Sequence, residues 1–228
     1  MEVIPNVHRI PGVRGANAYL LMDRTLILVD TGMPGNAEAI LGYVRGLSLA
    51  FVDLARIIIT HHHIDHAGSA AAIKRRALPV VSAHPADAPF ITGECPQPPP
   101  RGVFMHLLFR LVPAMSRFDP VAVDVPLQEG DNLDVLGGGT VIHVPGHTPG
   151  AIALHFPEER LLICGDAINR RVNRLGPPPK PFTANMEQAI VSLRRLAELD
   201  FEVLCPGHGA PIVGGADEQV RAMARELA

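Results

Sequence analysis

The length, composition and charge of the chain exclude several classes of protein. The sequence has 228 residues, of which 47% are hydrophobic and 19% charged, and this balance excludes an intrinsically disordered, fibrous or collagen-like protein. The formal net charge of -3 offers no general attraction to a polyanion, so we expect no nucleic-acid partner. The length is ordinary for a layered arrangement of helices and strands, and we expect a single domain over residues 1–228.

No apolar stretch of the sequence predicts export or a membrane span. The segment at residues 1–12 lacks the continuous apolar run of a secretory signal. The most apolar later stretch, Val103–Met115, is interrupted by charged and proline residues and is shorter than the ~18 residues needed to cross a bilayer. The three cysteines are widely spaced and form no CxxC pair, which favours a reducing compartment. We therefore expect a cytoplasmic protein with no membrane partner.

The predicted strands and helices alternate along the chain, which indicates an α/β (α+β) protein built in layers. Short apolar runs rich in branched residues predict buried strands. In chain order these strands are Leu26–Val29, Arg56–Thr60, Pro79–Ser82, Thr140–Val144, Ala151–Phe156, Leu161–Cys164 and Phe201–Cys205. Helical periodicity predicts the helices, with Asn185 as the N-cap of the third. The helices are Asn36–Leu47, Gly68–Arg76, Asn185–Leu199 and Asp217–Leu227.

Two proline-rich segments interrupt this order, at residues 94–126 and 167–183. Proline density of this kind prevents a regular strand or helix throughout either segment. Each lies beside the residues that carry the chemistry described below, so each is a candidate wall for a substrate. Within the first segment, the apolar run Val103–Met115 is interpreted as core packing, with a lid over an acyl chain or a homodimer contact as the alternatives. Phe104 and Phe109 are its candidate substrate-binding residues.

The strongest chemical signal is the run T-H-H-H-I-D-H-A-G, placed where a predicted strand ends and a predicted helix begins. A turn at the end of a strand lets alternate residues converge from one side, so His61 and His63 can share one metal ion. The histidine between them points away from that ion, and Asp65 with His66 faces a neighbouring ion. Imidazole and carboxylate donors suit zinc, iron or manganese, and no thiolate run indicates a structural cysteine-type site. The ligand set therefore indicates a catalytic metal centre.

Three further polar residues follow the ends of predicted strands. His147 lies in P-G-H-T-P-G between two strands, Asp166 follows L-L-I-C in G-D-A, and His208 follows F-E-V-L-C in P-G-H-G. Binding sites in layered α/β proteins gather at the carboxyl ends of strands. Each motif alone is a weak signal, whereas the three in this order after the first run predict one composite site.

The order H-x-H-x-D-H, a single His, G-D and then P-G-H-G resembles the metallo-β-lactamase superfamily, and the resemblance covers nearly the whole chain. It implies a four-layer αββα sandwich that holds two metal ions. By this resemblance one ion would be held by His61, His63 and His147, the other by Asp65, His66 and His208, and Asp166 would bridge them. The sequence V-D-T-G is similar to the end of an opening strand of the family, where Asp30 would orient a ligand histidine.

The resemblance and the chemistry of the ligands together predict a hydrolase. Two divalent ions lower the pKa of a water from ~15.7 to about 7, which supplies a metal-bound hydroxide at neutral pH. We expect this hydroxide to attack a small ester, lactone or thioester, with Asp65 or Asp166 assisting proton transfer as the catalytic residues. Zn²⁺, two ions per chain, is the expected cofactor, with Mn²⁺ or Fe²⁺ as alternatives. The expected partner is a small-molecule substrate.

The same motifs leave other activities open. Asp65 directly followed by His66 resembles the glyoxalase II and lactonase branches rather than the true β-lactamases. Persulfide dioxygenases share the ligand motif and use a single iron, which makes a sulfur dioxygenase the main alternative. Arg170 and Arg171, in a basic cluster after Asp166, are candidate substrate-binding residues that keep a phosphodiesterase or an acyl-CoA thioesterase open. A non-catalytic metal-binding module is disfavoured because every ligand position of the motif is filled.

Overall fold

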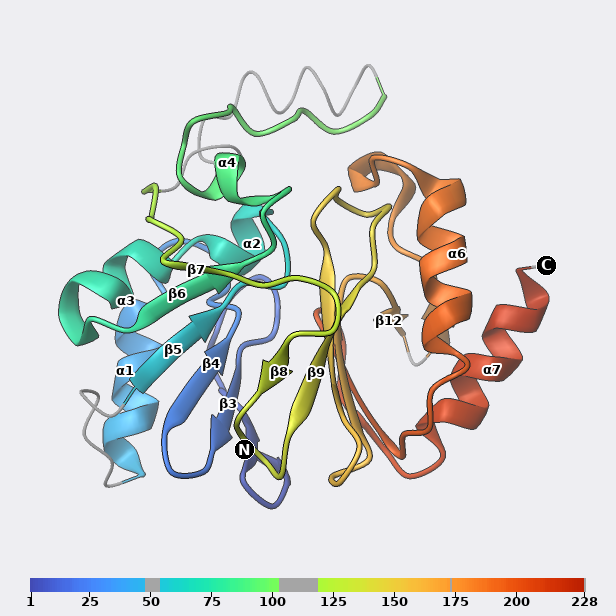
Figure 1. The fold of residues 1–228 in the computed structure, drawn as a ribbon, viewed down its shortest axis with the longest axis horizontal. Helices are drawn as coiled ribbons and strands as arrows, with labels where there is room; N and C mark the ends of the chain where they lie inside the picture. Colours follow the sequence, from blue (N-terminus) through green and yellow to red (C-terminus); the bar gives the residue numbers. More distant parts are fainter. Residues whose placement is uncertain (48–53, 103–118, 173, 228) are drawn as a thin grey trace.

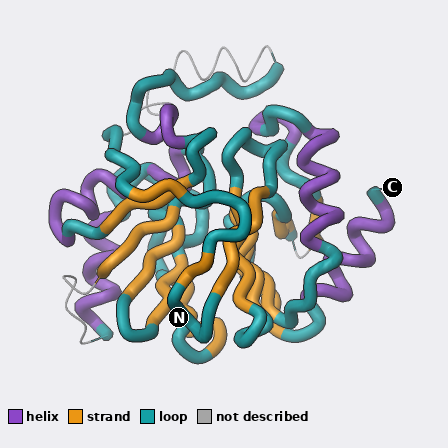
Figure 2. Tube along the Cα trace, viewed as in Figure 1, coloured by secondary structure: helices purple, strands orange, loops and turns teal. Residues whose placement is uncertain are grey.

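Two β-sheets face each other, and helices cover the outer face of each sheet (Figure 1, Figure 2). The computed structural model describes residues 1–47, 54–102, 119–172 and 174–227. The first half of the chain builds one sheet with its helices, and the second half builds the other. The layers are therefore helix, sheet, sheet and helix, and the expected αββα sandwich is confirmed.

The first sheet is antiparallel over one half and parallel over the other. Neighbouring strands from β1 to β4 pair antiparallel, and those from β4 to β7 pair parallel. In spatial order the strands are β1 (Glu2–Ile4), β2 (Val7–Arg9), β3 (Tyr19–Met22), β4 (Leu26–Val29), β5 (Leu54–Ile58), β6 (Val80–Ala83) and β7 (Val125–Pro126). Because β4, β5 and β6 run parallel, the turns that follow them lie at one edge of the sheet.

The second sheet is mostly antiparallel, with one parallel pair, β11 and β14. In spatial order its strands are β15 (Ile212–Val213), β14 (Val203–Pro206), β11 (Leu161–Gly165), β10 (Ile152–Phe156), β9 (Gly139–His143) and β8 (Asn132–Leu133). A separate hairpin pairs β12 (Asn169–Arg171) with β13 (Arg174–Gly176). The parallel pair places the residues after β11 and after β14 next to each other.

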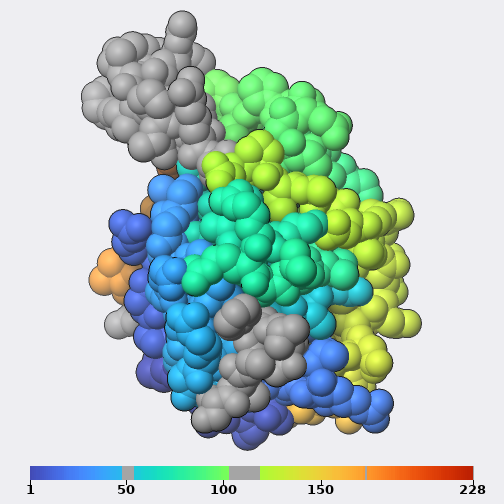
Figure 3. Space-filling model, turned by 90° about the vertical axis from the view of Figure 1, so that its left-hand side faces the viewer, coloured from blue at the N-terminus to red at the C-terminus, as the bar shows by residue number. Residues whose placement is uncertain are grey.

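Helices form the two outer layers. The first sheet carries α1 and α3, which lie side by side on the flank shown in Figure 3, and the second sheet carries α6 and α7. The helices are α1 (Ala37–Gly46), α2 (Ile64–Ala67), α3 (Ala70–Ala77), α4 (Ala88–Ile91), α6 (Met186–Leu196) and α7 (Ala216–Glu226). The side chain of Asn185 accepts a hydrogen bond from the backbone N–H of Gln188 at 3.1 Å, so the predicted N-cap of α6 is confirmed.

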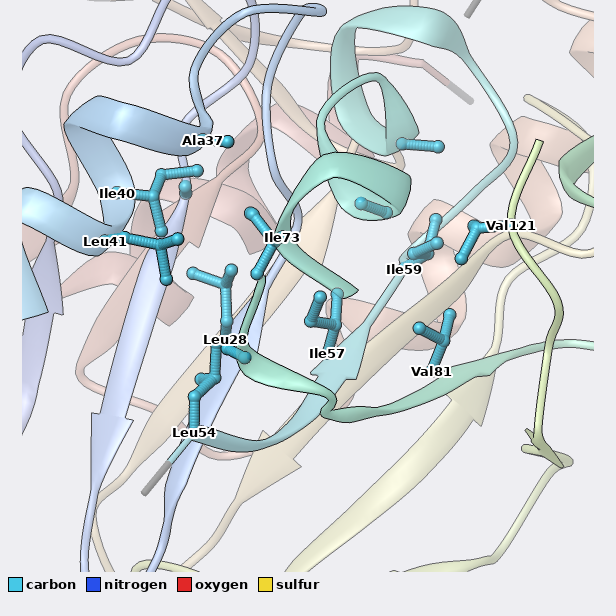
Figure 4. Close-up of a cluster of buried hydrophobic side chains, with 14 of the residues drawn as sticks. Leu28, Ala37, Ile40, Leu41, Leu54, Ile57, Ile59, Ile73, Val81 and Val121 are labelled. Carbon is cyan, nitrogen blue, oxygen red and sulfur yellow. The ribbon is translucent and has the colours of Figure 1, made fainter. Parts of the chain in front are cut away.

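Alternation along the strands divides the apolar side chains between the layers. In β4, Leu28 faces the helices and Val29 faces the second sheet. Figure 4 shows the helix-facing cluster, in which Ile40 and Leu41 of α1 and Ile73 of α3 gather over the sheet. A third cluster lies between the second sheet and its helices. Each fully buried aliphatic side chain contributes about 1.5 to 3 kcal/mol, so three apolar layers hold the four structural layers together.

The predicted strands and helices are all present, and most of their ends differ by one or two residues. The predicted strand Arg56–Thr60 lies at Leu54–Ile58. Thr60 leaves the strand because its backbone N–H and hydroxyl group donate to the carboxylate of Asp30, at 2.8 and 2.7 Å. The segment at residues 167–183, predicted irregular, contains the hairpin β12–β13 and a 3-10 turn.

The apolar run Val103–Met115 lies outside the described residues, together with Phe104 and Phe109. The lid, the dimer contact and the substrate contacts expected there therefore stay predictions. In the described part of the chain, none of the helices is long and apolar enough to cross a membrane.

Candidate metal centre

The seven candidate ligands come from turns that follow strand ends at one edge of the sandwich. The turn after β5 leads into α2 and carries the run that begins with His61. His147 lies between β9 and β10, Asp166 directly follows β11, and His208 lies just after β14. Strands that end at the same edge bring residues from distant parts of the sequence together there.

The first ligand group consists of His61, His63 and His147, whose candidate ligand atoms lie within 4.8 Å of one another. Nε2 of His61 is 3.1 Å from Nδ1 of His63. The ring centroid of His147 lies 4.7 Å from that of His61 and 4.6 Å from that of His63. Three imidazoles that converge in this way match the nitrogen donors that zinc and similar ions accept.

The second ligand group consists of Asp65, His66 and His208, again with ligand atoms within 4.8 Å of one another. Oδ2 of Asp65 lies 3.1 Å from Nε2 of His208. The side chain of His66 is fully buried, whereas those of Asp65 and His208 keep 31% and 33% of their surface exposed. This group therefore mixes nitrogen and oxygen donors and is open on one side.

Asp166 lies between the two groups and turns one carboxylate oxygen toward each. Oδ2 is 3.6 Å from Nε2 of His147 in the first group. Oδ1 is 3.4 Å from Nε2 of His66 and 3.6 Å from Nε2 of His208 in the second group. A carboxylate in this position can contribute one oxygen to an ion in each group.

Three atoms of this cluster are buried without a hydrogen-bond partner among the described residues: Nε2 of His66, Nε2 of His147 and Oδ1 of Asp166. A buried polar atom without a partner costs about 1 to 3 kcal/mol, so such atoms are rare in folded proteins and require an explanation. The three atoms face one another across the two ligand groups. Cations bound by these donors would satisfy all three, so the residues present fit a pair of metal ions.

The carboxylate of Asp30 sets the orientation of His66. Nδ1 of His66 lies 2.7 Å from Oδ2 of Asp30, and because a carboxylate only accepts, Nδ1 carries the hydrogen. The lone pair of Nε2 then points into the second group. The hydroxyl group of Thr60 donates to the same Asp30 oxygen, and its own oxygen lies 3.2 Å from Nδ1 of His61, which leaves Nε2 of His61 for the first group.

A second threonine orients His147 in the same way. The hydroxyl group of Thr183 donates to the backbone oxygen of Pro179 at 2.9 Å. Its oxygen can therefore accept from Nδ1 of His147, which lies 3.3 Å away. Nε2 of His147 is left with its lone pair toward Asp166. No sequence signal indicated Thr183, because it lies in a proline-rich segment without any ligand motif.

The histidines of the first group are neutral at physiological pH. Burial lowers the pKa of His61 and of His63 well below the usual range, and the charges of neighbouring histidines lower both further. Burial also lowers the pKa of His147 to about 4, against the opposing charge of Asp166. Three neutral imidazoles have free lone pairs, so an ion can bind here without displacing a proton.

The second group behaves differently. Burial lowers the pKa of His66, but the carboxylates of Asp30 and Asp166 outweigh burial and raise it well above the usual range. Burial raises the pKa of Asp65, but the hydrogen bond from His208 and the charge of His66 bring it down to about 2. The pKa of Asp166 is also lowered, because nearby histidine charges outweigh burial. In the metal-free protein, two ionised carboxylates therefore surround a protonated His66.

Asp87 connects two of the ligand turns. Its fully buried carboxylate accepts from the backbone N–H of His62 at 2.8 Å, from the hydroxyl group of Thr148 at 2.7 Å and from the backbone N–H of Gly150 at 2.7 Å. His62 belongs to the turn after β5, and the other two donors flank His147. Asp87 thus fixes the two turns relative to each other. Its sequence neighbours match no ligand motif, so only the tertiary contacts identify it.

A cavity of about 690 Å³ opens on the ligand groups. Its floor includes His63, Asp65, His147, Asp166 and His208. Its walls are largely apolar, from Met33, Ile64, Phe90, Phe182 and prolines of the segments at residues 97–101 and 179–184. The volume and the apolar lining are typical of a site for a small molecule. Both proline-rich segments expected to wall the substrate contribute to it.

The structure separates the two arginines named as candidate substrate ligands. Arg171 lines the cavity. Arg170 is not among the lining residues, and its guanidinium donates to the backbone oxygens of Ala210 and Pro211, each at 2.9 Å. Adjacent residues of a strand point to opposite sides, and both arginines lie on β12.

His62 is absent from the candidate ligand groups, as its alternation with its neighbours predicts, but it lines the cavity. Its ring packs on Phe90 with 4.4 Å between centroids. Nδ1 lies 2.7 Å from Oε1 of Gln97, whose amide nitrogen donates to the backbone oxygens of His62 and Phe90. The expectation of a residue pointing away from the site therefore holds for the ions and fails for the cavity.

Comparison with known proteins identifies the family. The family model described as the metallo-beta-lactamase superfamily matches residues 11–208. The chain belongs to the metallo-β-lactamase superfamily. A probable metallo-hydrolase of Bacillus subtilis is 31% identical to it over 234 residues, which cover 93% of this chain and 87% of that protein. The expected resemblance is confirmed.

Other members of the metallo-β-lactamase superfamily are more distant. A hydroxyacylglutathione hydrolase of Cereibacter sphaeroides is 32% identical over 158 residues, 68% of this chain but 48% of that enzyme. A solved metallo-beta-lactamase family protein of Thermus thermophilus superposes with a TM-score of 0.75 at 27% identity, over 99% of this chain and 79% of that one. The subclass B3 metallo-beta-lactamase of Bradyrhizobium japonicum, at 23% identity and a TM-score of 0.71, covers 100% of this chain and 91% of its own and shares the fold.

Membership of this superfamily, with metallo-hydrolases among the relatives, makes the chain a metal-dependent hydrolase, as expected. The His and Asp groups at the strand ends are its candidate sites for divalent metal ions. The residues that hold each ion, the identity of the metal and the substrate remain predictions.

Proposed function

We propose that the chain hydrolyses a small ester, lactone or thioester at a centre of two divalent metal ions. The observation that carries this proposal is the position of Asp166, which turns one carboxylate oxygen toward each of two ligand groups. In this proposal His61, His63 and His147 hold one ion, Asp65, His66 and His208 hold the other, and Asp166 bridges them. A single-ion centre would leave one of the two groups without a role.

The residues of the centre divide the work of hydrolysis. Two divalent ions bound here would supply a water activated at neutral pH and would polarise the carbonyl group of the substrate. Asp30 and Thr183 hold the ligand histidines in the tautomers that leave Nε2 free. Asp65 and Asp166 line the cavity and are the acceptors for the proton that the attacking water loses. Apolar walls exclude bulk water from the carbonyl group.

The size of the cavity and the relatives support the substrate class. A cavity of about 690 Å³ admits a small molecule and is too small for a folded macromolecule. Relatives of this chain include enzymes named for the hydrolysis of hydroxyacylglutathione. We therefore rank thioesters and oxygen esters ahead of phosphodiesters. Zinc is the first choice of metal, with manganese and iron as alternatives, because histidine nitrogen and aspartate oxygen suit all three.

The test combines elemental analysis of the purified protein with a hydrolysis screen over lactones, thioesters, oxygen esters and phosphodiesters. The proposal expects two equivalents of metal per chain and hydrolysis of at least one carbonyl substrate. One iron per chain, with oxygen consumed on a persulfide, would overturn it in favour of a sulfur dioxygenase. Hydrolysis confined to phosphodiesters would overturn the substrate class and leave the metal centre intact.

A variant of Asp166 tests the bridge itself. Asp166→Ala removes an oxygen donor from both groups, so we expect metal content to fall from two equivalents to about one or fewer and turnover to drop by about a thousandfold or more. Thermal unfolding of the variant, followed by circular dichroism, shows whether it is folded. A folded variant that keeps both ions and full turnover would exclude the bridging role.

A further inference from the structure

The two long walls of the cavity are built from proline. Pro98, Pro99 and Pro100 lie on one segment, and Pro179 and Pro181 lie on another. Proline has no backbone N–H and a fixed φ angle, so these walls offer few hydrogen-bond donors and have little conformational freedom to lose when a ligand binds. The part of a substrate that packs between them is therefore apolar.

The same cavity has a cationic side chain on its lining. Arg171 lies at the end of β12, in register with Arg174 of β13. Residues in register on antiparallel strands project from the same face, and two like charges placed in this way destabilise the pair. No salt bridge links either guanidinium to a carboxylate in the described part of the chain, whereas other exposed arginines such as Arg75 and Arg160 have carboxylate partners.

The hairpin that carries these arginines is fixed to the metal centre. The backbone N–H of Arg170 donates to the backbone oxygen of His208 at 3.3 Å. The guanidinium of Arg170 donates to the backbone oxygens of Ala210 and Pro211, at 2.9 Å each. β12 therefore lies against the turn of a candidate metal ligand, so Arg171 is held at a set position relative to the ions.

We propose that the natural substrate is an amphiphilic ester or thioester, with an apolar acyl group between the proline walls and an anionic group bound by Arg171 and Arg174. A carboxylate or phosphate on the alcohol or thiol portion supplies the anion, since a guanidinium binds both. The inference rests on the proposed hydrolase function. In the reaction one water is consumed, the carbonyl C–O or C–S bond breaks, and the products are a carboxylate, an alcohol or thiol, and one proton.

The first experiment compares thioesters that share a hexanoyl group. The thiols are coenzyme A, which carries phosphates, glutathione, which carries carboxylates, and N-acetylcysteamine, which has no charge. For zinc-loaded protein we expect kcat/KM for one of the anionic thioesters to exceed that for the uncharged one by about tenfold or more. The preferred thiol then distinguishes phosphate from carboxylate. Equal kcat/KM on all three would overturn the anionic part of the proposal.

The arginines are tested by the double variant Arg171→Gln and Arg174→Gln. We expect the ratio of kcat/KM between the preferred anionic and the uncharged thioester to fall about tenfold. The matched control is Arg24→Gln, an exposed arginine in the turn between β3 and β4, which should leave this ratio unchanged. An unchanged ratio in the double variant would overturn the assignment of these arginines.

The proline walls are tested with the length of the acyl group. On N-acetylcysteamine thioesters, kcat/KM should rise by about tenfold or more from acetyl to hexanoyl, because the added methylene groups leave water. A flat series would overturn the assignment of the apolar group to these walls.

A binding measurement separates this inference from the proposed function. S-hexyl thioethers of the same thiols have no carbonyl group, so they bind without reacting. By titration calorimetry with zinc-loaded protein, we expect the dissociation constant of the anionic thioether to rise about tenfold in the double variant, and that of the uncharged one to stay the same. Binding that depends on the arginines without hydrolysis of any ester would overturn the proposed function alone. Hydrolysis with binding that ignores the arginines would overturn the inference alone.

Discussion

Nδ1 of His66 lies 2.7 Å from Oδ2 of Asp30, and both side chains are buried beneath the metal centre. The same carboxylate accepts from the backbone N–H and the hydroxyl group of Thr60. Asp30 therefore accounts for three donors that would otherwise be buried without partners. It also determines which nitrogen of His66 is available to an ion.

The variant Asp30→Asn should weaken the second metal site. An amide presents one oxygen and one NH₂ group, so it cannot accept from both Thr60 and His66 as the carboxylate does. We expect affinity for one of two ions to fall about 10- to 100-fold, measured by competition with a chelator of known affinity. Asp134→Asn, an exposed carboxylate in the loop after β8, is the control. Equal affinities in the two variants would contradict the orienting role.

The variant Asp87→Asn should loosen the two ligand turns that Asp87 joins. The carboxylate accepts from His62, Thr148 and Gly150, and an amide would turn its NH₂ group toward one of these donors. We expect the free energy of unfolding to fall by about 2 to 4 kcal/mol and metal affinity to fall with it. Urea unfolding of the metal-free protein measures the first effect. Asp119→Asn, at an exposed ion pair, should stay within about 0.5 kcal/mol of the wild type, and a similar value for Asp87→Asn would refute its role.

The variant Gly207→Ala should damage the centre without removing a ligand. A Cβ atom at this position would overlap Oδ1 of Asp166 and lie 2.7 Å from Cε1 of His66. Either the bridge or the histidine must shift, so we expect elemental analysis to show about one equivalent of metal lost per chain. Gly46→Ala, at the end of α1, adds its Cβ to open space and should keep full metal content. Full metal content in both variants would show that the backbone at Gly207 does not limit the site.

Acidification should release the second ion before the first. Because the pKa of His66 is raised, this ring is protonated in the metal-free protein at neutral pH, and an ion must displace that proton. Affinity for this ion should therefore fall about tenfold or more for each unit of pH decrease. The pKa of His147 is about 4, and those of His61 and His63 are also lowered, so the first ion meets no proton competition until the pH approaches that value.

The measurement is chelator competition between about pH 8 and pH 5, with circular dichroism to verify that the protein stays folded. Two dissociation constants with different pH slopes are expected. Parallel slopes would contradict the assignment of the protonated histidine to one site. The Asp30→Asn variant should reduce the steeper slope, because it removes a carboxylate that raises the pKa of His66.

Much of the fold was predictable from apolar periodicity. Leu26–Val29 was predicted with its observed ends, because a run of branched residues buried on both faces has no competing interpretation. The predicted strand that ends at Thr60 was displaced by two residues, since the hydroxyl group of Thr60 bonds to Asp30 instead of continuing the sheet. The strand β12 was missed because its three residues lie in a proline-rich segment.

The candidate ligands were predictable for a different reason. His61, His63, Asp65 and His66 lie within one turn, and the sequence by itself determines that they are neighbours. His147, Asp166 and His208 each follow a strand, and strand ends at one edge converge by the geometry of the fold. Local spacing and strand position thus determined the composition of the centre.

Only the tertiary structure decided which residues support that centre and what the cavity admits. Asp87 and Thr183 contact the ligand turns across long stretches of sequence, and their hydrogen bonds depend on how the two sheets pack. Arg170 and Arg171 are equivalent in the sequence, yet one binds backbone oxygens and the other lines the cavity because neighbours in a strand face opposite ways. A sequence carries its ligand spacing locally, whereas hydrogen-bond partners and cavity walls exist only after distant segments have packed together.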